Sequence, residues 1–174
     1  MTKRPHNAAL GVTPYTLTDA DLLAIGRIVR GCAEIEDIID AHLCQVADIS
    51  PGQLLIFLGR SNMRSKLAMA EQLAKVKSKA AFEAHRTCFN HEAFSGLVKC
   101  RNAVAHGVLL GKLPDGAILF RTATANKTDD DTVAIKAIPY SPDDLQTFAK
   151  ISAELIPQFD KILRTTKLRR ECLE

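Results

Sequence analysis

Residues 94–108 read FSGLVKCRNAVAHGV and have the pattern of an amphipathic helix. Arg101 falls among the apolar residues of this stretch, at a place where a leucine would be expected. A guanidinium is always charged and is costly to remove from water unless it is paired. The pattern therefore predicts a helix whose arginine is either paired or functional. At 3.6 residues per turn the apolar residues form one stripe: Phe94, Leu97, Val98, Val104, Ala105 and Val108.

Two polar residues accompany Arg101. Asn102 and His106 are four positions apart, so they are neighbours on the flank of the predicted stripe. Arginine recognises phosphate with a planar fork of donors, and an imidazole moves protons near neutral pH. This combination favours chemistry on a phosphodiester. Two structural alternatives stand beside it: Arg101 could pair with an acid of the first helix, such as Glu34 or Asp37, and His106 could cap its helix.

The neighbouring segments are also expected to be helical. Thr18, Ser50 and Ser141 are each followed three residues later by an Asp or Gln, which is a start signal for a helix. A proline within the last of these helices, Pro157, predicts a kink. The predicted helices cover residues 19–48, 54–58 after the start signal at Ser50 and with a break near Gly59, 61–77, 80–89, 92–106 ended by Gly107, and a last helix from Ser141 onward.

Between the last two helices the pattern changes to that of strands. Residues 117–122 and 132–138 are rich in β-formers and are separated by a polar run, which predicts a hairpin with a long loop. An isolated hairpin is marginal and must pack against helices. The predicted fold class is therefore mainly α, an up-and-down helical bundle with a β-hairpin insertion at about 117–138. One domain is expected over 17–166, with a flexible arm at 1–16 and a basic tail at 167–174.

The composition excludes several classes of protein. The chain has 174 residues, a formal net charge of +3 and five cysteines without a C-x-x-C pair, which suits reduced thiols in the cytoplasm. We expect no signal peptide and no membrane span, because no apolar run is long enough. Aromatic residues make up only 5%, so stacking platforms for single strands are not expected. His42, His85 and His91 lack ligand spacing, and we expect no metal and no cofactor.

Each group of charged residues outside the motif has a structural and a functional interpretation. The helix at 61–77 is expected to bury Met63, Leu67, Ala70, Leu73 and Val76 and to expose a row of lysines and arginines. Such a row is commonly a solvated face, and as a phosphate-steering surface it would use Arg60, Arg64 and Lys66 to bind substrate. Glu34 and Asp37 are either a solvated helix face or acids that support Arg101 or orient His106.

The segment from Arg101 to His106 resembles the R-x(4–6)-H motif of the HEPN superfamily (higher eukaryotes and prokaryotes nucleotide-binding), including the asparagine directly after the arginine. In outline the resemblance extends over residues 18–165. It implies a homodimer whose two motif helices face each other and build one composite site. It also implies a metal-independent endoribonuclease that leaves a 2′,3′-cyclic phosphate and a 5′-hydroxyl. Arg101, Asn102 and His106 would be its catalytic residues.

The family habit further implies a toxin or defence effector that a regulatory or antitoxin protein restrains. Other relatives keep the helical bundle without catalysis. The alternative function is therefore a non-catalytic module for nucleotide binding, dimerisation or assembly, in which Arg101 and His106 are structural. The predicted hairpin at 117–138 is not accounted for by the motif.

Overall fold

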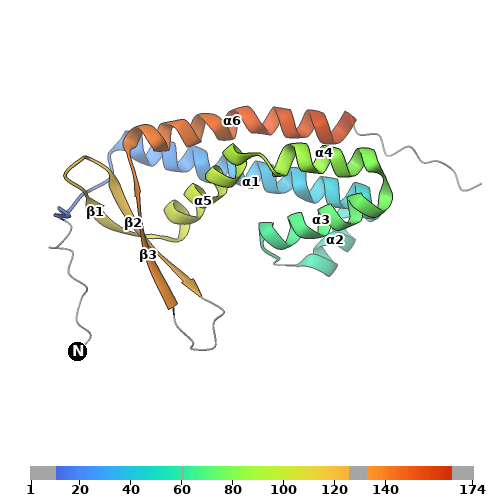
Figure 1. Cartoon of the computed structure of the whole chain (residues 1–174), viewed down its shortest axis with the longest axis horizontal. Helices are drawn as coiled ribbons and strands as arrows, with labels where there is room; N and C mark the ends of the chain where they lie inside the picture. Colours follow the sequence, from blue (N-terminus) through green and yellow to red (C-terminus); the bar gives the residue numbers. More distant parts are fainter. Residues whose placement is uncertain (1–10, 60, 126–132, 166–174) are drawn as a thin grey trace, which may run out of the picture. The chain divides into compact units, whose positions relative to one another are not determined.

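A computed structural model describes residues 11–59, 61–125 and 133–165 of the chain (Figure 1). Over these residues it is mainly helical, with a small antiparallel sheet between the last two helices. The predicted mainly α class is confirmed at this level. The helices are α1 (Asp19–Ala47), α2 (Pro51–Leu58), α3 (Met63–Lys77), α4 (Lys79–Phe89), α5 (Glu92–His106) and α6 (Pro142–Thr165), and the strands are β1 (Val108–Lys112), β2 (Ile118–Ala125) and β3 (Val133–Tyr140).

Local capping decides where three of the helices begin. The Thr18 backbone N–H donates to Asp21 Oδ2 over 2.9 Å, and the Asp21 N–H donates back to Thr18 Oγ1. Ser50 with Gln53, and Ser141 with Asp144, form the same reciprocal pair before α2 and α6. Each pair satisfies backbone donors that the first helical turn leaves without partners. The three start signals in the sequence are thereby confirmed, and α6 continues through Pro157 as a helix.

The sheet is larger than the predicted hairpin. β2 and β3 pair as expected, with Ile118 opposite Tyr140, and the predicted loop at 126–131 lies outside the described residues. β1 was not predicted, and it pairs antiparallel with β2 through an irregularity between Leu109 and Gly111. The sheet order is β1-β2-β3. Part of the expected flexible arm is also attached, because Thr13 exchanges backbone hydrogen bonds with Lys112.

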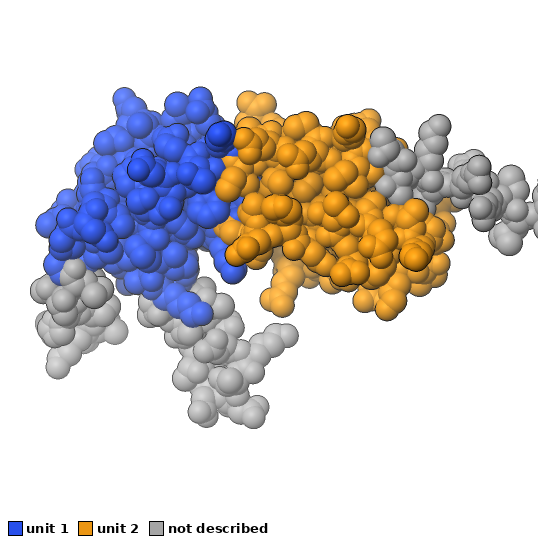
Figure 2. All heavy atoms as spheres, turned by 45° about the horizontal axis from the view of Figure 1, so that its top comes forward, with its two compact units in different colours: residues 1–29, 97–150 blue, residues 30–96, 151–174 orange. Residues whose placement is uncertain are grey.

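The described chain divides into two compact units, residues 1–29 with 97–150 and residues 30–96 with 151–174 (Figure 2). We call them unit 1 and unit 2. Helices α1, α5 and α6 each contribute residues to both. The single domain expected over 17–166 stays a prediction, and the expected tail at 167–174 lies outside the described residues.

Unit 1 packs the sheet against helix residues of α5 and α6. The Tyr140 ring lies edge-on to Phe148, with centroids 6.1 Å apart, and the centroid of Phe120 lies 6.3 Å from that of Tyr140. Burial raises the pKa of Tyr140 to about 12. From α5, the buried residues are Leu97, Cys100 and Ala103. Arg101 and Val104 lie at the edge of this buried row, and the predictions that Ala105 and Val108 face the core are wrong, since both are exposed.

Unit 2 is built around a row of rings. The imidazoles of His42 and His85 are stacked with centroids 5.9 Å apart, and His85 continues to Phe89 and Phe159. Both histidines are buried, and burial lowers the pKa of each to about 4. No hydrogen-bond partner among the described residues reaches either nitrogen of His42. Gly31 lets α6 approach α1 closely here, because a Cβ at this position would lie 2.6 Å from Ser152 Cβ.

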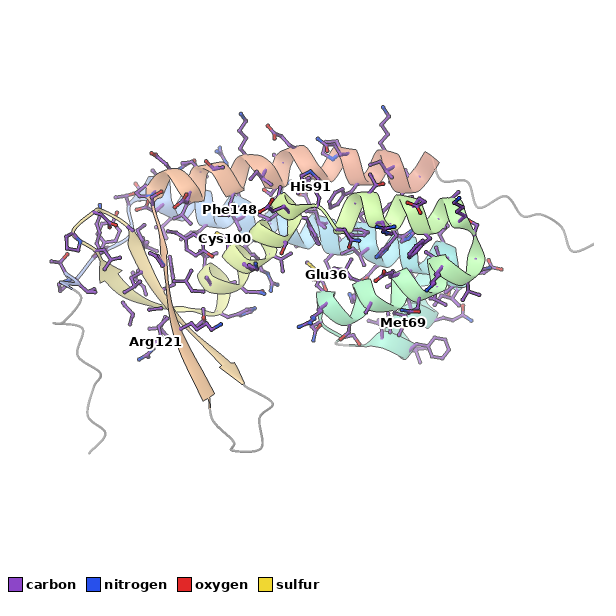
Figure 3. The ribbon with its side chains drawn as sticks, viewed as in Figure 1. Glu36, Met69, His91, Cys100, Arg121 and Phe148 are labelled. Carbon is purple, nitrogen blue, oxygen red and sulfur yellow. The ribbon has the colours of Figure 1, made fainter. Side chains whose placement is uncertain are left out.

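One charged residue of α3 lies inside unit 2. Lys66 was expected on the exposed face, but its ammonium is buried and binds Asp40 over 2.7 Å and Glu36 over 3.1 Å. Figure 3 shows Glu36 between α1 and α3. Burial alone would lower the pKa of Lys66, but the bonds to both carboxylates outweigh it and raise the pKa. Val76, expected inside, is instead exposed, and Ala70 and Ala74 fill the buried face.

Replacing Lys66 with methionine is expected to destabilise the protein by about 1–3 kcal/mol, because it leaves two partly buried carboxylates side by side without their cation. Urea unfolding followed by circular dichroism measures this difference. The matched control is Arg64→Met, which removes an exposed charge two residues earlier on the same helix. Equal unfolding midpoints for the two variants would contradict the expectation.

Candidate active site at the end of helix α5

The structure brings Arg101, Asn102 and His106 together on the last turns of α5. Arg101 Nη1 donates to Asn102 Oδ1 over 3.0 Å and contacts His106 Nε2 at 3.2 Å. Arg101 is half-buried, whereas Asn102 and His106 are exposed. All three belong to unit 1. One nitrogen of the Arg101 guanidinium therefore contacts both the Asn102 amide and the His106 imidazole, and these last two side chains are open to solvent.

The contact with Arg101 fixes the tautomer of His106. A guanidinium carries only donors, so Nε2 of the imidazole must accept and the ring proton must be on Nδ1. In this arrangement Arg101 donates to the lone pair at Nε2 of His106. A group that draws the guanidinium away, such as an anion, would release that lone pair for proton transfer.

Arg101 keeps donors that no described residue uses. Its Nε is buried and has no acceptor within residues 11–59, 61–125 and 133–165. Over the same residues no carboxylate forms an ion pair with Arg101, so the alternative in which it pairs with an acid of the first helix is not seen there. A buried donor without an acceptor costs about 1–3 kcal/mol.

Gly107 holds the end of α5 against the sheet. Its N–H donates to the Ala103 carbonyl over 2.8 Å and closes the helix, as predicted. A Cβ at Gly107 would collide with that carbonyl and would lie 3.4 Å from the carbonyl of Arg121. β1 begins at the next residue, and Val108 pairs with Arg121 of β2. The backbone around His106 is thus held by the last helical turn and, two residues later, by the first pair of the sheet.

Arg121, labelled in Figure 3, is a second cation of unit 1, and the sequence pattern did not single it out as a site residue. It is half-buried on β2 and is paired across the sheet with Val108 and Ala137. Adjacent Cα atoms are 3.8 Å apart and paired ones about 5 Å, so its Cα lies within about 13 Å of that of His106. The available signal was an arginine that interrupts the apolar run of residues 117–120.

Of the predicted supporting residues, Arg64, Lys66, Glu34 and Asp37 are described by the structure, and they belong to unit 2. Arg60 lies outside the described residues, and Arg64 is exposed on α3. Lys66 is held by Asp40 and Glu36, so it is not the exposed substrate-binding cation that was expected. Of the two acids, Glu34 binds Arg30 of its own helix over 2.7 Å, and Asp37 is exposed on α1.

The remaining reactive side chains offer no second centre of this kind within the described ranges. Cys32, Cys44, Cys88 and Cys100 form no disulfide, and burial raises the pKa of Cys88 to about 12. The fifth cysteine, Cys172, lies outside the described residues. Within residues 11–59, 61–125 and 133–165 no three His, Cys, Asp or Glu side chains are grouped so that they could hold a metal ion.

None of the helices in the described part of the chain is both long and apolar enough to cross a membrane. Comparison of the chain with protein-family models, with curated protein sequences and with solved structures gave no significant match.

Proposed function

We propose that this protein is a metal-independent endoribonuclease of HEPN type, with Arg101, Asn102 and His106 as its catalytic residues. The observation that carries the proposal is the contact of one guanidinium with both the amide and the imidazole. RNA transesterification needs a group that binds the phosphate, a proton acceptor and a hydrogen-bonding amide. Arg101 and His106 supply a phosphate-binding donor set and a base within 3.2 Å of each other.

In the proposed reaction a phosphate of RNA binds Arg101, and His106 Nε2 is released to accept the proton of the adjacent 2′-hydroxyl. The 2′-oxygen attacks phosphorus, and the bond from phosphorus to the 5′-oxygen breaks. A proton returned to the 5′-oxygen gives a 5′-hydroxyl and a 2′,3′-cyclic phosphate. Arg101 stabilises the charge that develops on the phosphate oxygens, and Asn102 holds the phosphate or the imidazole.

The proposal includes a homodimer in which a second copy of α5 completes the site. A second imidazole would supply the proton for the leaving oxygen. Support comes from the surface of unit 1, where Asn102 and His106 are exposed and the first turns of α1 expose Leu22, Leu23 and Val29. Exposed apolar side chains of this kind are typical of surfaces that a partner covers.

The test is incubation of the purified protein with a mixed RNA pool in EDTA, with mapping of the fragment ends and measurement of the mass in solution. We expect cleavage in EDTA, cyclic-phosphate ends and a mass of two chains. Absence of cleavage by folded dimer would overturn the ribonuclease proposal. Binding of a nucleotide without cleavage would favour the second candidate, a nucleotide-binding module, because the spare Nε donor of Arg101 suits a bound phosphate equally well.

Replacing Arg121 with glutamine is expected to raise the KM for RNA several-fold with little change in kcat, because a cation beside the motif would bind a phosphate that does not react. The matched control is Lys136→Gln on β3. Lys136 pairs with Thr122, the neighbour of Arg121, so it points to the opposite face of the sheet. Steady-state kinetics at two salt concentrations measure both variants, and equal KM values would remove Arg121 from the site.

A further inference from the structure

Unit 2 contains a cavity of about 560 Å³ that the proposed ribonuclease site does not use. It lies between α1, α2 and the start of α3. Ala41, Leu54 and Leu58 form apolar parts of its wall, and Asp37, Asp40 and Lys66 supply the charged part. A concave apolar surface with a few polar groups is the usual form of a binding site.

Among the described residues, the charged side chains at this cavity carry more negative than positive charge. The single ammonium of Lys66 is shared by Asp40 and Glu36, and Asp37 contributes a further carboxylate to the lining. Only one oxygen of Asp40 receives the bond from Lys66. The other, Oδ1, is buried and has no donor in the part of the chain that the structure describes. A buried carboxylate oxygen without a donor is costly, so this wall favours an occupant that brings a cation or a strong donor.

The helix at the rim of the cavity exposes its apolar side chains. α2 buries only Leu54, while Leu55, Ile56 and Phe57 are exposed by 69, 80 and 71%. Leu55 also lines the cavity. Scattered exposed apolar residues are ordinary, but three large ones in succession beside a cavity are typical of a surface that a partner covers. We call Leu55, Ile56, Phe57 and the cavity the α2 surface.

We propose that the α2 surface binds a segment of a partner protein that places a lysine or arginine against Asp40 and covers Leu55, Ile56 and Phe57 with apolar side chains. A small amine could fill the cavity but would leave Ile56 and Phe57 exposed. An anionic membrane surface would be repelled by Asp37 and Asp40. A peptide segment with a basic residue between apolar ones meets both the charge and the apolar area, and this binding is independent of the proposed ribonuclease activity.

The test is a selection of random twelve-residue peptides displayed on phage against the full chain, with removal of peptides that bind the double variant Leu55→Asp, Phe57→Asp. We expect the enriched peptides to carry Lys or Arg beside apolar residues. Their affinity, measured by fluorescence anisotropy, should fall at least tenfold with Asp40→Asn. The matched control is Val76→Asp, another exposed apolar residue of unit 2, which should leave the affinity unchanged.

Three results would overturn the proposal. They are the absence of peptides that depend on Leu55 and Phe57, enriched peptides without a basic residue, and full affinity for Asp40→Asn. Because Asp40 also binds Lys66, the fold of that variant is checked by circular dichroism. If it does not fold, Asp37→Asn replaces it, since Asp37 lines the same cavity without an ion pair to Lys66.

Discussion

Replacing His106 with alanine is expected to lower RNA cleavage by roughly 10²–10⁴-fold, which is the usual contribution of a general acid or base. The imidazole is exposed and contacts only Arg101 among the hydrogen bonds described for it, so the thermal midpoint should change little. Cleavage rates are measured under single-turnover conditions in EDTA, so that slow binding or product release does not hide the loss.

The control for this experiment is His91→Ala. His91 is also exposed and lies before α5, but it belongs to unit 2 and has no arginine contact in the described part of the chain. It should cleave RNA like the unmodified protein. If His106→Ala retained its rate, the proposed catalytic role of the motif would be wrong even if the protein cuts RNA by other residues.

Unit 2 is expected to lose stability as the pH falls from about 6.5 to about 4. His42 and His85 have a pKa near 4 in the folded protein, against an ordinary value of 6.5, because burial disfavours their charged forms. Protonation therefore favours unfolding. The two neutral rings leave the folded state at its full stability above the pKa that histidine has in the unfolded chain. That stability declines as the pH falls toward the lower pKa of the rings in the folded protein. The loss is up to roughly 3 kcal/mol for each ring.

Denaturant unfolding at pH 7.5, 6, 5 and 4 measures this loss. The double variant His42→Leu, His85→Phe should flatten the curve, since Phe at position 85 keeps the ring contact with Phe89. His91→Ala serves again as the control and should keep the original slope. Asp37 and the ion pair of Asp160 with Arg164 lie near the two histidines, and they are unchanged in all three proteins. Identical pH slopes for all three would show that the buried pair does not control acid stability.

The helices could be predicted because their signals are local. The cap pairs of Thr18, Ser50 and Ser141 and the end at Gly107 depend on residues a few positions apart. β1 could not be predicted in the same way. It is short, contains Gly111, and exists because it pairs with β2, which the chain reaches only after a turn. Lys66 was misplaced because its partners lie on another helix, and a lysine without known partners is assigned to water.

The motif itself was accessible to sequence reasoning, and its surroundings were not. The four-residue spacing of Asn102 and His106 predicts that they are neighbours on one helix, and the long side chain of Arg101 contacts both of them from one and five positions away. Arg121 approaches through strand pairing, and its distance along the sequence gives no sign of this. The stacking of His42 on His85 has the same origin, because the two rings come from α1 and α4. Contacts between elements are decided by packing, which spacing alone does not reveal.

The division of three helices between the two units affects how the chain can fold during synthesis. Unit 2 requires residues 151–165, so residues 30–96 cannot complete their core when they leave the ribosome. Unit 1 likewise waits for residues 97–150, although α1 begins it. This protein therefore cannot follow the usual order, in which an N-terminal domain folds first. Both cores are completed only when α6 emerges, and until then the apolar face of α1 lacks the packing that α6 supplies.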